Sequence, residues 1–326
     1  MRMVLVTGAS GFVGMHVVEA LSRGGLNVRC LVRPTSRVEY IRHCNPELVE
    51  GDVLKPESLP PALEGVEGVV HCAGLTKARR MNDLYRVNRD GAENLYRACA
   101  AAGTRFKAIV HIGSQAALGP ARPGGMTTES QTPAPVSTYG RSKLEGQRVA
   151  ESFMPSLPVT VLLPSSVYGP ADRDFLSAFR LAKRGIVTRI GRQTPMSFVY
   201  AEDLAEAVVL CLSNRRARGK TFLVDDGGVH TMERMGRTIA EVMGRDIFTV
   251  PVPLPFALLV ARIAELQSAV RGKATILNRE KVREYARASW VCSSRRIRDD
   301  LGFSPACNLR AGVKRTIEWY RKHGWL

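Results

Sequence analysis

The first 165 residues alternate short apolar runs, rich in β-branched residues, with longer segments whose apolar positions recur at helical spacing. This alternation is typical of a parallel sheet whose strands are joined by crossover helices. Strands are predicted at Val4–Thr7, Val28–Val32, Leu48–Glu50, Gly68–His71, Ala108–Ile112 and Val159–Leu163. Helices are predicted near Val13–Ser22, Met81–Ala102 and Thr138–Phe153. We therefore expect an α/β fold built on a six-stranded, doubly wound parallel sheet.

After Pro170 this rhythm weakens and the loops lengthen. Prolines at 251, 253 and 255 predict a loop, because each removes a backbone donor and restricts the residue before it. Helices are still predicted at Leu204–Leu212, Met232–Met243, Phe256–Ala269 and Leu309–His323. We expect a main domain of residues 1–170 and a smaller C-terminal lobe formed mainly by 171–326, with elements of 197–224 returning to the main domain.

The chain has 326 residues, 45% of them apolar, and a formal net charge of +17. This composition excludes a disordered or collagen-like chain. The longest apolar run, around 250–264, is interrupted by prolines and by Arg262, so it falls short of the ~20 apolar residues of a membrane span. The charge would attract phosphates, nucleic acid or an anionic membrane. Because the basic residues form no single dense run, nucleic-acid binding is disfavoured as the main role.

Met1-Arg2 leads directly into the first predicted strand, which leaves no room for a signal-peptide core. We therefore expect a cytoplasmic protein. The cysteines are odd in number and scattered, with no Cys-x-x-Cys pair and no histidine at metal-ligand spacing, which predicts reduced thiols and no metal site. They are Cys30, Cys44, Cys72, Cys99, Cys211, Cys292 and Cys307.

The first predicted strand runs into the sequence TGASGFVG at 7–14, with glycines in the spacing G-x-x-G-x-x-G. Glycines let a strand-to-helix turn approach a pyrophosphate closely, and the unpaired amides of the helix N-terminus then bind its charge. The alternative is a glycine-rich turn with a packing role only. The order of strand, turn and helix favours a Rossmann-type nucleotide site. Its candidate cofactor-binding residues are Gly8, Ser10, Gly11, Phe12, Val13 and Gly14.

The second predicted strand ends in Leu31-Val32-Arg33, and no acid follows it before Glu39. An NAD-selective site usually carries an acid here to bind the ribose 2′-hydroxyl. Arg33, with Arg37 close behind, is instead suited to neutralise a 2′-phosphate. The sequence therefore favours NADP as the cofactor, with NAD as the alternative. Arg33 could otherwise be only a solvated strand end.

Tyr139 and Lys143 lie four residues apart, on one face of a predicted helix, and Ser114 follows the fifth predicted strand. Tyrosine has an unperturbed pKa near ~10, and a neighbouring ammonium favours its phenolate. Tyr139 could then exchange a proton with an alcohol or ketone, with Lys143 supplying the charge and Ser114 holding the reacting oxygen. These residues predict hydride-transfer chemistry on a nicotinamide cofactor.

With these motifs the chain resembles the extended short-chain dehydrogenase/reductase superfamily. This superfamily contains nucleotide-sugar epimerases and dehydratases, dihydroflavonol-type reductases and 3β-hydroxysteroid dehydrogenases. The resemblance runs nearly end to end. It includes TGASGFVG at 7–14, GDV at 51–53, HCAG at 71–74, VNRDGAENL at 87–95, the segment 114–119, YGRSK at 139–143, PSSVYGP at 164–170 and FVYAEDLAEA at 198–207.

The resemblance implies that Ser114, Tyr139 and Lys143 form a catalytic triad, with Lys143 also holding the nicotinamide ribose. It places Asp52 and Val53 against adenine, although Asp52 could be a simple turn acid. Residues 1–170 would be the NAD(P)-binding domain and the C-terminal lobe the substrate-binding one, and a homodimer is expected. Further cofactor-binding residues would be Ala73, Gly74, Pro164, Ser166 and Val167, and substrate would meet Ser114, Tyr139, Ser166 and Met196.

The chain departs from the nucleotide-sugar members where those bind substrate. They typically carry an arginine where this chain has Leu163, an asparagine where it has Ser166, and a phosphate-binding arginine where it has Met196. A diphosphate without charged donors binds poorly. The departures therefore favour a neutral or hydrophobic substrate.

The segment 253–262 predicts a markedly apolar helix beside the expected substrate cleft. It could wall an apolar pocket, pack inside the lobe, or make a peripheral membrane contact together with Arg262, Arg271 and Lys273.

Three functions stay open at this point. The first is an NAD(P)-dependent oxidoreductase that interconverts a secondary alcohol and a ketone on a hydrophobic small molecule, sterol-like or a β-hydroxy/β-keto compound. The second is a nucleotide-sugar epimerase or dehydratase. The third is a non-catalytic cofactor-sensing or scaffold protein, which the complete Ser-Tyr-Lys set disfavours.

Overall fold

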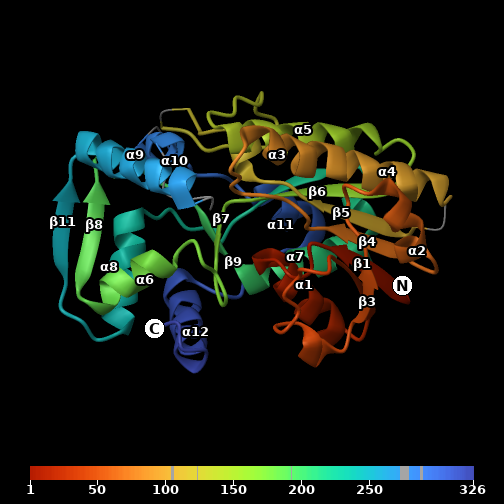
Figure 1. Ribbon diagram of the computed structural model, residues 1–326, viewed down its shortest axis with the longest axis horizontal. Coiled ribbons are helices and arrows are strands. Elements are labelled where there is room, and N and C mark those ends of the chain that lie inside the picture. The colour runs from red at the N-terminus through yellow and green to blue at the C-terminus, as the bar shows by residue number, and fades with distance from the viewer. Residues whose placement is uncertain (104–105, 123, 192, 272–278, 287–288) are drawn as a thin grey trace.

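A seven-stranded parallel sheet forms the centre of the protein, in the order β10-β6-β5-β4-β1-β2-β3 (Figure 1). The computed structural model describes residues 1–103, 106–122, 124–191, 193–271, 279–286 and 289–326. The strands of this sheet are β1 (Met3–Thr7), β2 (Asn27–Val32), β3 (Glu47–Glu50), β4 (Gly68–His71), β5 (Ala108–Ile112), β6 (Val159–Pro164) and β10 (Thr221–Val224). The predicted α/β, doubly wound fold is confirmed.

Both faces of the sheet are buried, because successive side chains of each strand point to opposite sides. Val4 and Val6 of β1 pack in the cluster beneath α1 and α7, whereas Leu5 packs in the cluster on the opposite face. Figure 1 shows α3, α4 and α5 over one face and α1 and α7 over the other. These helices are α1 (Phe12–Arg23), α3 (Met81–Tyr85), α4 (Gly91–Ala101), α5 (Thr138–Ser152) and α7 (Ala201–Ser213), and the short α2 (Leu59–Leu63) belongs to the α4 side.

The sequence predicted six strands, and the structure has a seventh, β10, at the edge beside β6. Thr221 pairs with Val161 and Val224 with Pro164, in parallel register. Four residues carry too little periodicity to predict a strand, and the sheet edge that pairs with them comes from a distant part of the chain. Helix α11 (Arg295–Leu301) also returns to this edge and contacts β10.

The prediction of a single helix over 81–102 is also wrong, because a π-helical turn at Arg86–Asp90 separates α3 from α4. The turn presents Asn88, which is buried. Its Nδ2 donates to Leu75 O at 3.0 Å and to Ser142 Oγ at 2.9 Å, while its Oδ1 accepts from Leu75 N at 2.8 Å. The irregular turn therefore ties the loop after β4 to helix α5.

The remaining elements form a second group at one end of the sheet (Figure 1). Their core contains Phe179, Tyr200, Met235, Ile317 and Tyr320. Besides the short parallel pair β7 (Ser166–Tyr168) and β9 (Phe198–Tyr200), this group comprises α6 (Leu176–Lys183), β8 (Ile186–Ile190), α8 (Met232–Val242), β11 (Phe248–Val252), α9 (Leu254–Arg271), α10 (Arg279–Ala286) and α12 (Leu309–Lys322). The predicted helices over 204–212, 232–243, 256–269 and 309–323 are all present.

The loop predicted from the three prolines is wrong. Pro251 lies inside β11, which pairs only with β8, so its missing donor can face away from the partner strand. Pro255 lies in the first turn of α9, where a helix has no intrahelical partner for the backbone amide. Proline is excluded from central strands and helix interiors, but Pro251 lies in an edge strand and Pro255 in the first turn of a helix.

None of the helices in the described ranges is long and apolar enough to cross a bilayer.

Two histidines, His71 of β4 and His111 of β5, are buried side by side in the sheet, with ring centroids 5.3 Å apart. His71 Nδ1 contacts Thr7 Oγ1 at 2.7 Å, and His111 Nδ1 contacts the Tyr96 hydroxyl at 3.0 Å. Burial lowers the pKa of His71 to about 3, and burial together with the charge of its neighbours lowers the pKa of His111 well below its usual value. Both rings are therefore neutral at physiological pH.

This burial predicts acid sensitivity of the fold. Below pH ~6.5 the unfolded chain protonates these histidines while the native state does not, so the free energy of unfolding falls as pH falls. His111→Gln, which can keep the bond to Tyr96, should remove up to about 1.4 kcal/mol per pH unit of that slope between pH 6.5 and 4. Urea unfolding at several pH values measures it. Equal slopes for wild type and His111→Gln would contradict the assignment.

Candidate active site

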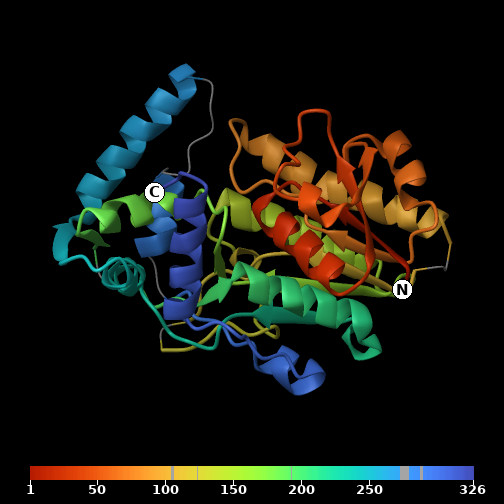
Figure 2. The same ribbon diagram turned by 90° about the horizontal axis from the view of Figure 1, so that it is seen from below.

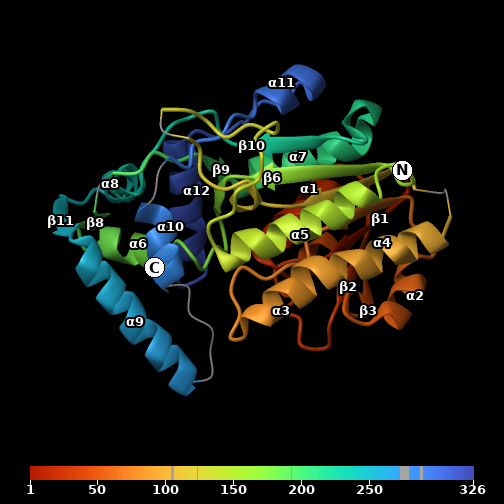
Figure 3. The same cartoon turned by 90° about the horizontal axis from the view of Figure 1, so that it is seen from above.

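The loops that follow six parallel strands meet at one edge of the sheet, beside the second group of elements (Figures 1 and 3). Parallel strands place their carboxyl ends together, and open α/β sheets bind their ligands there. The predicted site residues distribute over these loops, with Gly8–Gly14 after β1, Arg33 after β2, Asp52 and Val53 after β3, Ala73 and Gly74 after β4, Ser114 after β5, and Pro164–Val167 at the end of β6 and in β7.

The glycine turn between β1 and α1 has no room for side chains. Gly8 has φ +69°, and a Cβ there would stand 2.6 Å from Ala73 N. A Cβ on Gly14 would stand 2.1 Å from Gly8 O. Gly11 precedes α1, and no side chain caps the helix N-terminus. An open helix N-terminus behind a tight glycine turn fits the pyrophosphate of a dinucleotide.

Arg33 is exposed at the end of β2, with its backbone N bonded to Ser36 Oγ at 3.0 Å. Its guanidinium has no acidic partner within 4 Å in the described part of the chain, although Glu50 of β3 pairs in register with the preceding residue, Val32. Asp52 holds a turn, because its Oδ1 accepts from Leu54 N at 2.9 Å. Val53 is buried, and its carbonyl accepts from Asn94. These residues border the place where the adenosine half of a dinucleotide would lie.

The Ser114 hydroxyl acts on Tyr139 by hydrogen bonding, which lowers the pKa of the phenol. Ser114 caps the short helix that follows β5, where Ala116 N donates to its Oγ at 3.2 Å. Tyr139 lies in the first turn of α5, whose N-cap Ser137 accepts from Gly140 N at 3.1 Å. Both hydroxyls are thus placed by helix starts.

Lys143 lies one turn beyond Tyr139 on the same helix and is buried. Its ammonium donates to Ile112 O at 2.6 Å, and a Cβ on Gly74 would stand 3.7 Å from it. Burial lowers the pKa of Lys143 to about 8. Lys143 therefore stands between the loops after β4 and β5, where the nicotinamide ribose would lie.

A cavity of about 1040 Å³ opens between the sheet edge and the second group of elements. Ser114, Tyr139, Lys143, Ser166 and Met196 all line it. Phe12, Val13, Gly74, Pro164 and Val167 also line it. The structure thus brings these predicted residues together, whereas Gly8, Ser10, Gly11, Gly14, Arg33, Asp52, Val53 and Ala73 lie outside the cavity wall, along the carboxyl edge.

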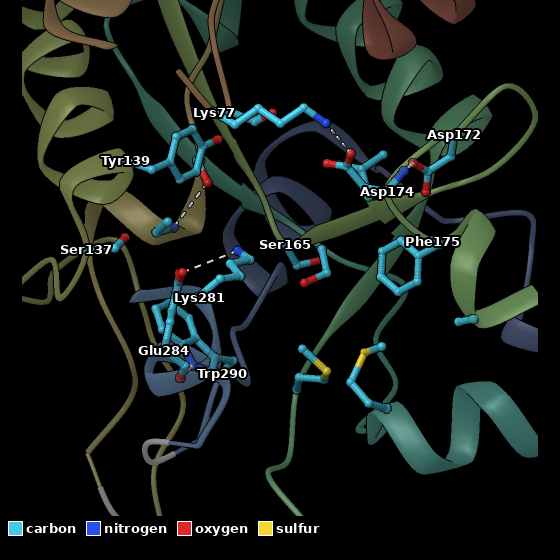
Figure 4. Close-up of a pocket in the computed structure, with 18 of the residues that line it drawn as sticks. Lys77, Ser137, Tyr139, Ser165, Asp172, Asp174, Phe175, Lys281, Glu284 and Trp290 are labelled. Carbon is cyan, nitrogen blue, oxygen red and sulfur yellow. Dashed lines mark hydrogen bonds and ion pairs between the residues drawn. The ribbon is translucent and has the colours of Figure 1, made fainter. Parts of the chain in front are cut away.

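The far wall of the cavity combines large apolar side chains with charged ones. Phe175 and Leu181 come from the α6 region, Val187 from β8, Met232 from α8 and Trp290 from the segment before α11. Figure 4 shows Phe175 and Trp290 around the space that Tyr139 faces.

Helix α10 contributes three charged residues to the site that the sequence analysis did not single out. Glu280 Oε1 accepts from Thr138 N at 2.6 Å and from Thr138 Oγ1 at 3.0 Å, so it caps the first turn of α5. Lys281 lies next to it and pairs with the buried Glu284 at 3.3 Å (Figure 4). The charges themselves are visible in the sequence, but nothing in it says that this helix packs against α5.

Burial raises the pKa of Tyr139, while the hydrogen bond from Ser114 and the positive charge of Lys281 oppose this rise. Glu284 and Asp174 act in the opposite direction to Lys281. Lys281, a cation from the C-terminal lobe, therefore lowers the pKa of the candidate proton donor.

A second acidic group lies across the cavity. Asp172 is 3% exposed, and burial raises its pKa to about 7. Its Oδ1 accepts from Asp174 N at 2.7 Å, and Asp174 pairs with Lys77 at 3.2 Å (Figure 4). The sequence offers no signal for this group beyond the acids that follow Gly169-Pro170.

The chain belongs to the NAD dependent epimerase/dehydratase family, whose model matches residues 4–224, more than half of its length. The resemblance to the extended short-chain dehydrogenase/reductases is thereby confirmed, and the protein is an NAD-dependent enzyme of that type. The family and the relatives indicate an enzyme, which disfavours a non-catalytic sensor or scaffold.

Three known proteins illustrate the range of this similarity. The ceramide reductase of Caulobacter vibrioides is 32% identical over 327 residues, covering 99% of this chain and 96% of that protein. The UDP-glucose 4-epimerase of Vibrio cholerae is 27% identical over 331 residues, covering 97% and 95%. The solved structure of MoeE5 with UDP-glucose and NAD superposes with a TM-score of 0.77 at 26% identity, covering 98% of this chain and 99% of that one.

The effect of Lys281 on the pKa of Tyr139 leads to a testable prediction. Lys281→Met should raise the pKa of Tyr139, because it removes the cation that opposes the effect of burial. Ultraviolet difference titration of each protein against its Tyr139→Phe counterpart reports this phenol alone. Lys281→Arg should restore the titration, and Arg283→Met, an exposed cation of the same helix, should not move it. An unchanged titration in Lys281→Met would show that the cation has no part in the ionisation.

Proposed function

We propose that this enzyme interconverts a secondary alcohol and a ketone on a hydrophobic small molecule, sterol-like or a β-hydroxy/β-keto lipid, using NADP(H). The observation that carries the proposal is the cavity itself. It presents Ser114 and Tyr139 on one wall, and the exposed surface of its lining taken together is mainly apolar. A substrate that fits it has one polar reacting group and an extended apolar part.

The charged groups of the cavity support a neutral substrate, because four of its cations other than Lys143 have anionic or aromatic neighbours. Lys77 pairs with Asp174, and Lys281 pairs with Glu284. The charge of Arg189 acts on Glu233, and Arg173 stacks over the Trp325 ring at 5.0 Å. A diphosphate would have to compete with these neighbours for its counter-charge.

The proposed mechanism uses the triad in the roles that its positions suggest. When substrate binds, Ser114 turns its one hydroxyl proton from the phenol to the substrate oxygen, and Tyr139 exchanges a proton with that oxygen as it changes between alcohol and ketone. The bound nicotinamide supplies the hydride acceptor or donor. Lys143 would hold the ribose of that cofactor and would add positive charge one helical turn from Tyr139. Ser166 and Met196 then contact the substrate beside the reacting carbon.

The name of the relative from Caulobacter vibrioides, a ceramide reductase at 32% identity over 99% of this chain, supports a lipid substrate and a reductive direction. The residues that replace the nucleotide-sugar contacts support it too. Leu163 is fully buried in the sheet, and Met196 is 2% exposed, so neither could be exchanged for a charged contact without rearrangement.

A nucleotide-sugar epimerase or dehydratase is the second candidate. It is favoured by Arg173 and Arg189, which both line the cavity, and by the similarity to MoeE5, solved with UDP-glucose and NAD. Such an enzyme would convert its substrate without net change in reduced nicotinamide.

The first experiment follows reduced-nicotinamide absorbance with the purified protein, NADPH or NADH, and a panel of long-chain β-keto lipids, keto-sterols and nucleotide sugars. Tyr139→Phe should lower turnover of the keto lipid by ~10²–10⁴-fold, because the proton donor is lost. It should leave cofactor affinity nearly unchanged. Tyr40→Phe, which removes a hydroxyl outside the cavity, is the matched control. Conversion of nucleotide sugars without net absorbance change would establish the second candidate instead.

The cofactor preference has its own test. Arg33→Ala should weaken NADPH binding ~10–100-fold and leave NADH binding within a factor of about two, because a charged hydrogen bond to the 2′-phosphate contributes ~1.5–3 kcal/mol. Fluorescence titration of the bound nicotinamide measures both constants. Arg148→Ala, an exposed arginine of α5, is the control. Equal losses for the two cofactors would remove the basis for an NADP preference.

A further inference from the structure

Helix α9 exposes a stripe of large apolar side chains to solvent. Phe256 is 57% exposed and Leu266 61%, and between them lie Leu259, Val260 and Ile263. Their spacing of three and four residues places all five on one side of the helix. Figures 2 and 3 show α9 projecting from the body of the protein, with no other element on its outer side.

The buried side of the same helix packs against α10, where Ala257 and Ala261 are buried against Val282 and Leu258 is partly buried in the same cluster. Ala264 and Gln267, four residues after Val260 and Ile263, line the reaction cavity at the border of the stripe. Helix α9 therefore buries one side and still exposes five large apolar side chains beside the cavity. Stability of the lobe alone does not favour that exposure.

The charge around the stripe is positive. Arg262 is exposed in the middle of the helix and has no acidic partner in the ranges that the structure covers. Glu265, the only acid of α9, is neutralised by Arg279 at 2.8 Å. The whole chain carries a net charge of +17. Lys273 and the side chain of Arg271, which the sequence analysis grouped with Arg262, lie outside the described residues.

A second copy of the chain fits this surface less well than a lipid bilayer does. Five apolar side chains on one projecting helix fall short of the roughly 20–30 residues that each partner contributes to a stable protein interface. An interfacial helix, in contrast, needs only an apolar face that enters the headgroup and acyl boundary by ~5–10 Å, with cations beside it. The net positive charge also favours an anionic bilayer over another copy of the same chain.

We propose that α9 docks the protein on the surface of an anionic lipid bilayer, with Phe256, Leu259, Val260, Ile263 and Leu266 inserted at the acyl boundary and Arg262 at the headgroups. Because Ala264 and Gln267, at the border of the stripe, line the cavity, docking also brings the cavity next to the membrane. This second part rests on the proposed function, since only a hydrophobic substrate would enter from the bilayer.

The test of docking needs no substrate. The full-length protein is mixed with vesicles of phosphatidylglycerol and phosphatidylcholine, or of phosphatidylcholine alone, and the bound fraction is measured by flotation. Wild type should bind the anionic vesicles, and Leu259→Glu/Ile263→Glu should lower the apparent affinity at least tenfold. Leu48→Glu/Val229→Glu, with the same charge change at exposed apolar positions outside α9, should bind like wild type. Thermal unfolding of each variant verifies that it is folded.

Several outcomes would overturn the proposal. One is wild-type protein that does not float with either vesicle. Another is the α9 variant floating as well as wild type. A third is a dimer in solution that the α9 substitutions dissociate without any effect on flotation, which would assign the stripe to a second copy of the chain.

A second measurement separates docking from the proposed reaction. With a short-chain, water-soluble β-keto compound the α9 variant should keep wild-type turnover, whereas with a long-chain keto lipid presented in anionic vesicles its turnover should fall at least tenfold. Flotation without turnover on any keto compound would overturn the proposed reaction and leave docking intact. Equal turnover of wild type and variant on the vesicle-borne lipid would overturn delivery from the membrane.

Discussion

Burial of Tyr139 disfavours the phenolate that proton exchange requires and raises its pKa, and several separate elements partly oppose that effect. Ser114 donates a hydrogen bond to the phenol from the loop after β5, and Lys281 contributes a positive charge from α10. Glu280 caps the start of α5 and so fixes the tyrosine relative to that cation. The phenol can take part in proton exchange in this cavity because Ser114, Lys281 and Glu280, from three separate parts of the chain, act on Tyr139 or on the start of its helix.

The helix pair α9 and α10 joins the two surfaces on which the proposed activity depends. Its inner face carries Lys281 and Glu284 to the reaction cavity, and Val282 holds α9 through Ala257 and Ala261. Its outer face carries the exposed apolar stripe. One small lobe would thus affect both the ionisation of the proposed proton donor and the route by which a hydrophobic substrate enters the cavity.

Much of the fold and of the site could be predicted because the relevant signals are local. Alternating apolar runs identified six strands, and the glycine spacing at 7–14 and the four-residue separation of Tyr139 and Lys143 depend only on neighbours in sequence. Strand β10 escaped prediction because four residues carry little periodicity. Pro251 and Pro255 led to the wrong prediction of a loop. An edge strand and a first helical turn both tolerate proline, because neither needs its missing backbone donor, and the sequence does not show that these residues lie there.

The sequence by itself indicated the class of enzyme, through motifs that resemble one superfamily, and it singled out Ser114, Tyr139 and Lys143 as candidates, because a nucleotide-binding turn and a helical pair require fixed residue types at fixed spacing. Only the tertiary structure decided that Lys281 acts on Tyr139, more than a hundred residues away, and that Asn88 and Glu280 tie down helix α5. It also decided which side of α9 meets solvent. These features arise from packing between distant segments, where burial and charge act through space rather than along the chain.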